Sequence, residues 1–324
     1  MRERNFNNEV SLFLSVKMSQ PNIKEWKGYA WALLGTVAFS SLYVFSKAGL
    51  NLVSLPQFGF YYFGMGFLIN LAFILISGKW PQVKGITRPV VRILLLLGCI
   101  DLISNVTFFM AIRAIPDPAV TSFLGNLFPV FLSLEGVFIL KEKFTKVEAF
   151  GASLAIVGAF VISYTGELNW REFFIPGTGL VVVNTLFAAT VSVIVKKNVD
   201  KTSPEVYNLN SNAWIFLFFL GYFIFSGDPI AIPQKAVENI ALGAFFGAFV
   251  GLLSFYYSYH YIAASRSSII QGMKGIFVLI ISYFFFGKLP VPVQLWGGGI
   301  TVFGVLIMTL SQAGILQIGA KRNN

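Results

Sequence analysis

Two stretches decide the fold: "GYAWALLGTVAFSSLYVFSK" at residues 28–47 and "GTGLVVVNTLFAATVSVIVK" at residues 177–196. Each is almost uncharged, ends in a lysine and has the length of about 20 residues that an α-helix needs to cross a membrane. Aligned at an offset of 149 residues, they share a glycine, a threonine, a valine and the final lysine. The pairs are Gly28/Gly177, Thr36/Thr185, Val44/Val193 and Lys47/Lys196. This pattern predicts a chain built from two related halves.

A second pair of stretches extends the repeat. "VFLSLEGVFILKEKFTKVEAFGASLAIVG" at 130–158 matches "IFVLIISYFFFGKLPVPVQLWGGGITVFG" at 276–304, at an offset of 146 residues. The shared positions include Gly151/Gly297 and Gly158/Gly304. Matches between apolar residues arise by chance in such a chain, so the shared glycines and lysines are the stronger evidence.

The composition is that of an all-α integral membrane protein. Hydrophobic residues make up 56% of the chain, charged residues only 12%, and the mean hydropathy is +0.73; soluble domains carry about 25% charge. One cysteine and one histidine exclude a disulfide framework and any zinc site with several Cys or His ligands, so we expect no metal and no cofactor. Ten segments are predicted to span the membrane: 28–46, 58–77, 93–112, 119–140, 148–165, 177–195, 206–226, 240–260, 267–286 and 293–312.

The positive charges indicate the orientation. With ten spans, 18 of the 24 lysines and arginines fall on the side of the N-terminus, which the positive-inside rule places in the cytoplasm together with the C-terminus. The cations lie between apolar runs, so the net charge of +10 reflects topology and no nucleic-acid partner is expected. Five spans per half make the second repeat inverted relative to the first. The predicted parts are a cytoplasmic tail (1–27), a first five-helix repeat (28–165), a linker (166–176), a second repeat (177–312) and a cytoplasmic tail (313–324).

The stretch "GNLFPVFLSLEGVFILKEKFTKVEAFGASLAIVGAFVIS" at 125–163 resembles the drug/metabolite transporter superfamily, and within it the EamA-like family. Its most specific part is the helix–KEK–helix unit with Pro129, Glu142 and Gly151; the second copy has Gly275 and Lys288 in place of Pro129 and Glu142. Over residues 28–312 the resemblance implies alternating access around a central cavity lined by spans 1, 3, 4, 6, 8 and 9. It also implies a small solute, such as an amino acid, nucleoside, sugar phosphate or nucleotide sugar. Pro129 is expected to break the fourth helix.

Three ionisable residues lie inside predicted spans: Asp101, Glu135 and Lys274. Each costs roughly 2.5–3.5 kcal/mol to insert, so each marks a buried pair or a solute pathway. Counted at about 1.5 Å per residue from the cytoplasmic ends, their depths are similar, about 9–14 Å. Lys274 has three interpretations: an ion pair with Glu135 or Asp101, a contact to an anionic group of a substrate, or an ammonium that reaches the interface. Glu135 lies about half a turn around its helix from Asn126 and the other polar residues of that span. This direction favours contact with a neighbouring helix.

Polar residues recur at helical spacing on the spans that the resemblance places around the cavity. For any single residue, hydrogen bonding between helices explains such a stripe; the convergence of several stripes favours a cavity. The tyrosines Tyr43, Tyr256 and Tyr257 are further candidates for its wall. The candidate binding residues are Lys274, Gln271, Asp101, Asn105, Asn126, Ser40, Tyr43 and Ser192.

These features favour a secondary active transporter that exports a small polar metabolite, such as an amino acid or a related anionic or zwitterionic compound. The expected setting is the bacterial inner membrane, with lipid as surroundings and a monomeric or homodimeric state. A membrane-embedded enzyme would need clustered His, Asp or Glu residues near the interface, and a channel would more often assemble repeated subunits. We therefore treat both as alternatives and expect the protein not to be an enzyme.

Overall fold

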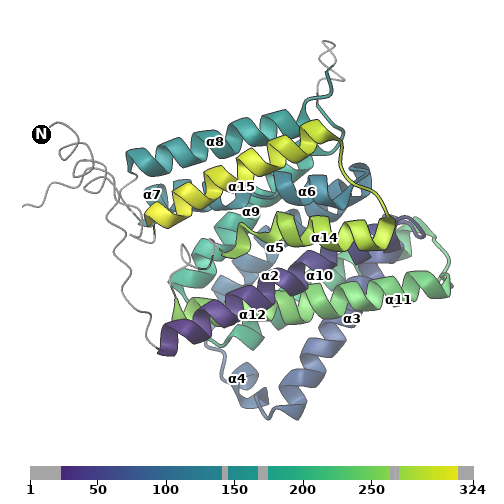
Figure 1. Ribbon diagram of the computed structural model, residues 1–324. Helices are drawn as coiled ribbons and strands as arrows, with labels where there is room; N and C mark the ends of the chain where they lie inside the picture. Colours follow the sequence, from purple (N-terminus) through teal and green to yellow (C-terminus); the bar gives the residue numbers. More distant parts are fainter. Residues whose placement is uncertain (1–22, 141–144, 167–173, 263–266, 268–269, 313–324) are drawn as a thin grey trace, which may run out of the picture.

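The fold is a bundle of apolar helices (Figure 1). The computed structural model describes residues 23–140, 145–166, 174–262, 267 and 270–312. Within these residues the only other regular feature is a β-bridge between Tyr164 and Phe174. The KEK turn at 141–143, most of the predicted linker, the C-terminal tail and nearly all of the N-terminal tail lie outside the described residues.

The helices follow one another with short connections, which leaves no room for an inserted soluble domain between the described spans. In chain order they are α2 (Ile23–Leu50), α3 (Leu55–Ile76), α4 (Trp80–Lys84), α5 (Arg88–Ala114), α6 (Pro118–Leu124), α7 (Leu127–Leu140), α8 (Lys146–Ser163), α9 (Thr178–Lys197), α10 (Pro204–Ser226), α11 (Gln234–Gly243), the π-helix η1 (Ala244–Gly251), α12 (Leu252–Tyr261), α14 (Lys274–Phe286) and α15 (Pro292–Gln312).

Nine stretches of the described residues are long and apolar enough to cross a membrane, and α14 is a shorter apolar helix. The prediction of an all-helical membrane protein is therefore confirmed. Local sequence explains where several spans begin. Ser54 and Gln57 form a capping box at the start of α3, and Thr145 and Glu148 form another at the start of α8. Their side chains accept hydrogen bonds from backbone N–H groups that have no partner within the helix.

The fourth and ninth spans are interrupted. The fourth divides at Gly125 and Asn126 into α6 and α7, one turn before Pro129. Proline lacks an N–H and its ring clashes with the carbonyl four residues earlier, here that of Gly125, so a regular helix cannot pass this point. The ninth span, expected to run unbroken over 267–286, has a turn at Gly272 and Met273, and α14 begins only at Lys274. Glycine is a poor helix former, and no proline marks this break.

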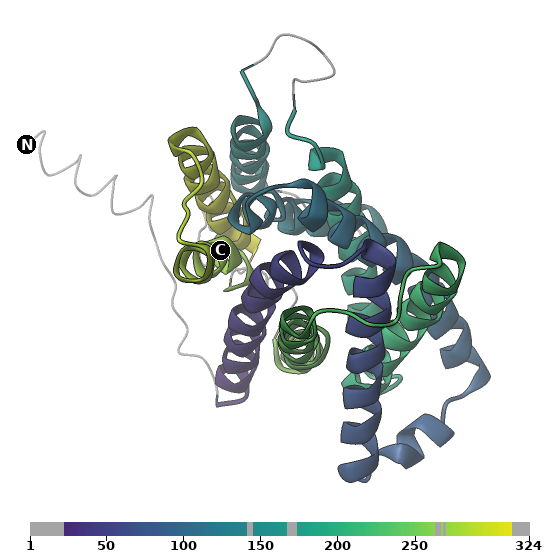
Figure 2. The same cartoon turned by 90° about the vertical axis from the view of Figure 1, so that its right-hand side faces the viewer.

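Close helix pairs join the two halves. α8 and α15 lie side by side along one edge of the bundle in both views (Figures 1 and 2). Glycines let their backbones touch: a Cβ on Gly151 would lie 2.6 Å from the carbonyl oxygen of Gly304, and one on Gly158 would lie 2.7 Å from that of Gly297. The four glycines that match between the two halves of the sequence therefore all lie where α8 and α15 cross, although each contacts a glycine other than its own match. α3 packs on α10, α5 on α9, and α2 on α12.

Candidate functional site

A cavity of about 140 Å³ lies at the centre of the bundle. Its wall is formed by α2, α3, α5, α9, α10, η1, α12 and both interrupted spans. A cavity of about 150 Å³ is large enough to hold a benzene molecule, so this space suits a small solute. Aromatic rings cover much of the wall, with polar and charged groups between them. The aromatic residues used below are Phe39, Tyr43, Phe108 and Phe255, and the polar ones are Asp101, Asn105, Ser192, Ser211, Gln271 and Lys274.

Lys274 enters the cavity as the first residue of α14, directly after the interruption of the ninth span. Its ammonium nitrogen lies 5.7 Å from the ring centroid of Phe39 and 5.4 Å from that of Tyr43, both on α2. Such cation–π contacts contribute about 0.5–2 kcal/mol each. Within the described residues the Lys274 ammonium makes no ion pair. Rings thus hold the charge in place and leave its hydrogen-bond donors available.

Asp101 faces the same cavity from α5 and is 8% exposed. Its partners are neutral. The side-chain amide of Asn105, one turn along the helix, lies 3.5 Å from a carboxylate oxygen, and the Ser211 side chain of α10 lies near the carboxylate. Asp101 and Asn105 thus form a polar patch on the wall, as their spacing predicted.

Gln271 and Ser192 meet at a third polar patch. The side chains of both lie near the hydroxyl of Tyr259 on α12, and the Gln271 amide donates to Ser267 at 3.1 Å. Gln271, Ser192 and Tyr259 all line the cavity. Of the eight candidate binding residues, the structure places six on the cavity wall: Tyr43, Asp101, Asn105, Ser192, Gln271 and Lys274.

The other two candidates lie behind the wall. Ser40 is fully buried; its hydroxyl donates to the carbonyl of Thr36 at 2.6 Å and to that of Lys274 at 3.4 Å, so it supports the start of α14. Asn126 is 1% exposed at the interruption between α6 and α7, and its amide nitrogen has no hydrogen-bond partner among the described residues. That nitrogen lies 3.5 Å from where a Cβ on Gly275 would stand, so the two interrupted spans touch here.

The ion pair between Glu135 and Lys274, one of the interpretations that the sequence left open, is not formed in the structure. Glu135 accepts a hydrogen bond of 2.8 Å from the hydroxyl of Thr190 on α9 and does not line the cavity. The half turn that separates it from the polar stripe of its own helix explains this direction. Glu135 therefore faces a neighbouring helix, and Lys274 is held by aromatic rings.

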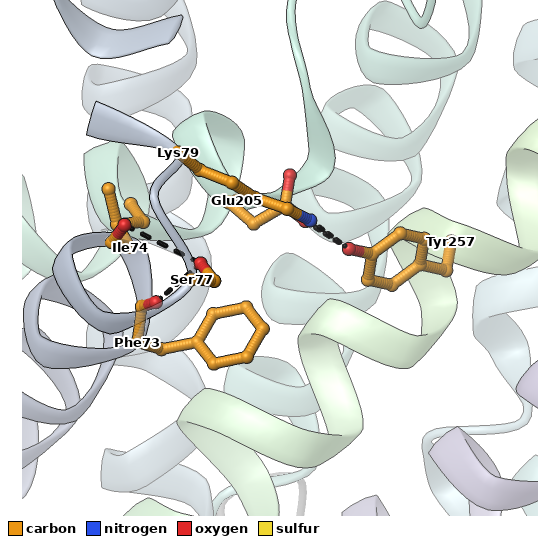
Figure 3. A network of polar contacts seen from close by, with 6 residues as sticks. All are labelled: Phe73, Ile74, Ser77, Lys79, Glu205 and Tyr257. Atoms are coloured by element: carbon orange, nitrogen blue, oxygen red, sulfur yellow. Dashed lines mark hydrogen bonds and ion pairs between the residues drawn. The ribbon is translucent and has the colours of Figure 1, made fainter. Parts of the chain in front are cut away.

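Polar contacts also tie the ends of α3 and α10 together (Figure 3). After α3, the Lys79 ammonium pairs with Glu205 in the first turn of α10 and donates to the Tyr257 hydroxyl of α12 at 2.9 Å. Tyr257 also donates to Glu205, and its ring stacks on Trp31 of α2 with centroids 4.9 Å apart. We call Lys79, Glu205 and Tyr257 the Lys79 cluster.

A counterpart lies at the opposite ends of the same helices. After α10, Asp228 accepts a hydrogen bond of 2.5 Å from Ser54, the N-cap of α3. The next residue, Pro229, accepts one of 2.8 Å from Gln57. Asp228 stands 149 residues after Lys79, the same offset that relates the first stretches of the sequence.

A model of the EamA-like transporter family matches the chain twice, at residues 26–164 and 175–310. The chain belongs to the EamA-like transporter family. The family resemblance expected from the sequence is thereby confirmed, and with the apolar helices it makes this chain a multi-pass integral membrane protein.

Relatives of this EamA-like protein are named as transporters whose activity is uncharacterised. An inner membrane transporter of Escherichia coli, YhbE, is 24% identical over 188 residues, which cover 55% of this chain and 57% of the relative. A transporter of Archaeoglobus fulgidus is 27% identical over 203 residues, 62% of this chain and 65% of the relative. YetK of Bacillus subtilis is 23% identical over 164 residues, 49% of this chain and 47% of the relative. The matches thus span roughly half to two thirds of the length of these relatives.

A solved crystal structure shares the fold of this EamA-like protein. Its TM-score is 0.65 at 15% sequence identity, and the alignment covers 90% of this chain and 99% of the other. At this identity the likeness concerns the fold alone, so the role of each cavity residue is argued from the geometry of this chain.

Sequence reasoning missed several residues of the EamA-like bundle. Phe39, Phe108 and Phe255 were not among the predicted cavity residues, because the sequence of an apolar helix does not distinguish a face toward a cavity from a face toward lipid. Lys79 entered the sequence argument only through the count of lysines and arginines, and Glu205 did not enter it. An available signal was their position: Lys79 follows α3, and Glu205 lies in the first turn of α10.

Proposed function

We propose that this protein is a secondary active transporter of a small polar solute that carries an anionic group. The observation that carries the proposal is Lys274: its ammonium faces the central cavity, rests on two aromatic rings and has no carboxylate partner among the described residues. An ammonium within a membrane span that has no charged partner among the described residues is costly, and an anion entering the cavity offsets that cost. Lysine suits carboxylate or phosphate as a compact point charge.

Alternating access around this cavity is the proposed mechanism. Its basis is an inverted pair of five-helix repeats, residues 28–165 and 177–312, for which the double match of the family model is one support. The contacts between helices give a second support. In the first repeat α2 packs on α12 and α14. Its counterpart α9 packs on α5 and α7, the counterparts of α12 and α14. In such repeats the solute site lies at the repeat interface, where discontinuous helices meet. Here the two interrupted spans meet beside Lys274 and Asn126.

The Lys79 cluster and the Ser54–Asp228 contact are the proposed closures at the two ends of the cavity. The Lys79 cluster ties the end of α3 to the start of α10, and the Ser54–Asp228 contact ties the end of α10 to the start of α3. The Lys79 cluster also includes α12, whose Tyr256 and Tyr259 line the cavity. Opening one end requires breaking one set while the other persists. We place the transporter in the bacterial inner membrane with both termini in the cytoplasm, and we propose export, the direction that the resemblance to exporters implies.

The test is a thermal-shift panel on detergent-purified protein. Amino acids, nucleosides, sugar phosphates and organic acids are added to wild type, Lys274→Gln and Glu135→Gln. Glu135→Gln is the matched control, because it also replaces a charged group within a span by an amide but lies outside the cavity. We expect one anionic or zwitterionic class to raise the Tm of wild type and of Glu135→Gln and to leave Lys274→Gln unchanged. An equal rise in Lys274→Gln, or a rise with uncharged nucleosides alone, would overturn the proposed role.

A further inference from the structure

Two opposite charges face the cavity from different helices without meeting. Lys274 enters from α14 and Asp101 from α5. Among the described residues the ion-pair geometry is found only between Lys79 and Glu205, outside the cavity wall. The cavity therefore holds a cation and a carboxylate, neither of which has a charged partner in the part of the chain that the structure describes.

Aromatic rings connect Lys274 with α5, the helix that carries Asp101. Lys274 rests on Phe39 and Tyr43, and both rings contact Phe108 of α5, with centroid distances of 6.3 and 5.1 Å. Phe108 lies seven residues after Asp101 on the same helix, which corresponds to about 10 Å along the axis. Asp101 in turn lies near the side chains of Asn105 and Ser211. This chain of rings leads from Lys274 to α5 at Phe108, about two turns from Asp101, and from it we infer that the two charges stand toward opposite ends of the cavity.

This arrangement defines the chemistry of a matching solute. A single anionic group would neutralise Lys274 and leave the buried Asp101 carboxylate without a charged partner. In an α-amino acid the ammonium and the carboxylate sit on one carbon, too close together to reach both ends. A molecule with the two groups at opposite ends of a short carbon chain would neutralise both side chains and place its apolar stem against Phe39 and Phe108. The small volume of the cavity limits the length of that stem.

We propose that the solute carries a carboxylate and an ammonium group at opposite ends of a short aliphatic chain, as an ω-amino acid does. Lys274 binds the carboxylate and Asp101 binds the ammonium. This inference rests on the proposed transport function and adds to it the second charge and the spacing.

The experiment compares two homologous series on the full-length protein in detergent or nanodiscs. The first series is glycine, 3-aminopropanoate, 4-aminobutyrate, 5-aminopentanoate and 6-aminohexanoate. The second is the set of monocarboxylates of the same lengths, which lack the amine. Binding constants come from titration calorimetry or from the concentration dependence of Tm. The variants are Asp101→Asn, Lys274→Gln and the control Glu135→Gln, whose carboxylate lies outside the cavity.

Wild type and Glu135→Gln are expected to bind one of the ω-amino acids of four to six carbons about tenfold or more tightly than glycine or the matching monocarboxylate. A charged hydrogen bond contributes about 1.5–3 kcal/mol, which corresponds to at least that factor. In Asp101→Asn the preference for the amine falls to about twofold or less while the carboxylates still bind. Lys274→Gln binds neither series.

Four results would overturn the inference. If Asp101→Asn keeps the wild-type preference for the amine, Asp101 does not bind it. If glycine binds more tightly than every longer ω-amino acid, the spacing is wrong. If wild type binds carboxylates with no preference for an amine, Asp101 holds something other than the solute and the role of Lys274 stands. If wild type binds no member of either series while another anion from the panel stabilises it, this inference fails and the proposed function remains.

Discussion

Lys47 and Lys196, 149 residues apart, bind the C-terminal ends of two different helices in the same way. Lys47, in the last turn of α2, donates to the carbonyls of Ile112, Arg113 and Ile115 at the end of α5, at 2.9, 3.0 and 2.8 Å. Lys196, in the last turn of α9, donates to the carbonyls of Tyr259 and Ile262 at the end of α12, at 2.7 and 3.4 Å. The last carbonyls of a helix lack partners within it, and a cation also complements the helix dipole.

Replacing either lysine by methionine is therefore expected to destabilise the fold. Lys47→Met should lower the free energy of unfolding by about 1–3 kcal/mol, because it leaves buried carbonyls unsatisfied. Lys196→Met should cost less, since Lys196 is more exposed and makes fewer of these bonds. The measurement is denaturant unfolding in detergent, with the exposed neighbour Lys197→Met as the control. Equal stabilities for Lys47→Met and Lys197→Met would contradict the capping role.

The contact of α8 with α15 gives a second prediction. Ala at position 158 would bring a Cβ within 2.3 Å of the Thr301 hydroxyl and 2.5 Å of the Thr301 backbone nitrogen. Overpacking of this kind costs about 1–3 kcal/mol. Gly299→Ala is the matched control, because a Cβ there has no atom within 4 Å apart from its own stretch of helix backbone, and alanine favours a helix. Thermal unfolding should show a lower Tm for Gly158→Ala and an unchanged or higher one for Gly299→Ala; the reverse order would show that the helices are not in close contact here.

The Lys79 cluster should behave as a coupled unit. Glu205 is 2% exposed, so losing Lys79 leaves a buried carboxylate with one partner fewer. We expect Lys79→Met and Glu205→Gln each to lower the free energy of unfolding, and the double variant to lose clearly less than the sum of the two. A double-mutant cycle from chemical unfolding measures this coupling. Strict additivity would mean that the pair contributes nothing.

The same cluster predicts a pH dependence. Burial lowers the pKa of the Lys79 ammonium, but its hydrogen bonds to Glu205 and Tyr257 outweigh this effect, and the pKa lies above its ordinary value of 10.5. A raised folded-state pKa gives stability that is fully present below the unfolded-state pKa and is lost as pH rises through the folded one. The stability difference between wild type and Lys79→Met should therefore stay constant up to about pH 10 and shrink above it. A difference that grows with pH in that range would refute the assignment.

The orientation of the chain in the membrane can be tested by cysteine labelling once Cys99 is replaced. In a Cys99→Ser background, Lys288→Cys and Lys201→Cys place one thiol each in an exposed connection, after α14 and between α9 and α10. With both termini cytoplasmic, an impermeant maleimide should label Lys288→Cys on intact cells and Lys201→Cys only after permeabilisation. The opposite pattern would invert the proposed orientation.

Hydropathy and charge were enough to predict the spans, since a membrane admits only helices of a fixed minimum length. Breaks in those helices were predictable only where a residue forces one. The ring of Pro129 clashes with the carbonyl of Gly125 in a regular helix, so the interruption of the fourth span was predictable from the sequence. The break at Gly272 carries no such signal, because glycine only weakens a helix and the surrounding packing decides whether it bends.

The site was predicted in part for a similar reason. Residues at helical spacing share a face, which placed Asp101 with Asn105 and Gln271 with Lys274. Which face meets which neighbour depends on helix rotation, and a single sequence does not contain that information. Hence Glu135 meets Thr190 and not Lys274, and the pairing of Lys79 with Glu205 went unpredicted.

The most direct test of the central claim is exchange transport in proteoliposomes. The labelled compound that gives the largest thermal shift is supplied outside, with the same compound unlabelled inside, for wild type, Lys274→Gln and Glu135→Gln. We predict saturable uptake that requires internal solute, is retained in Glu135→Gln and is lost in Lys274→Gln. Uptake that rises linearly with concentration, or that survives in Lys274→Gln, would contradict a transporter whose cavity binds its solute through Lys274.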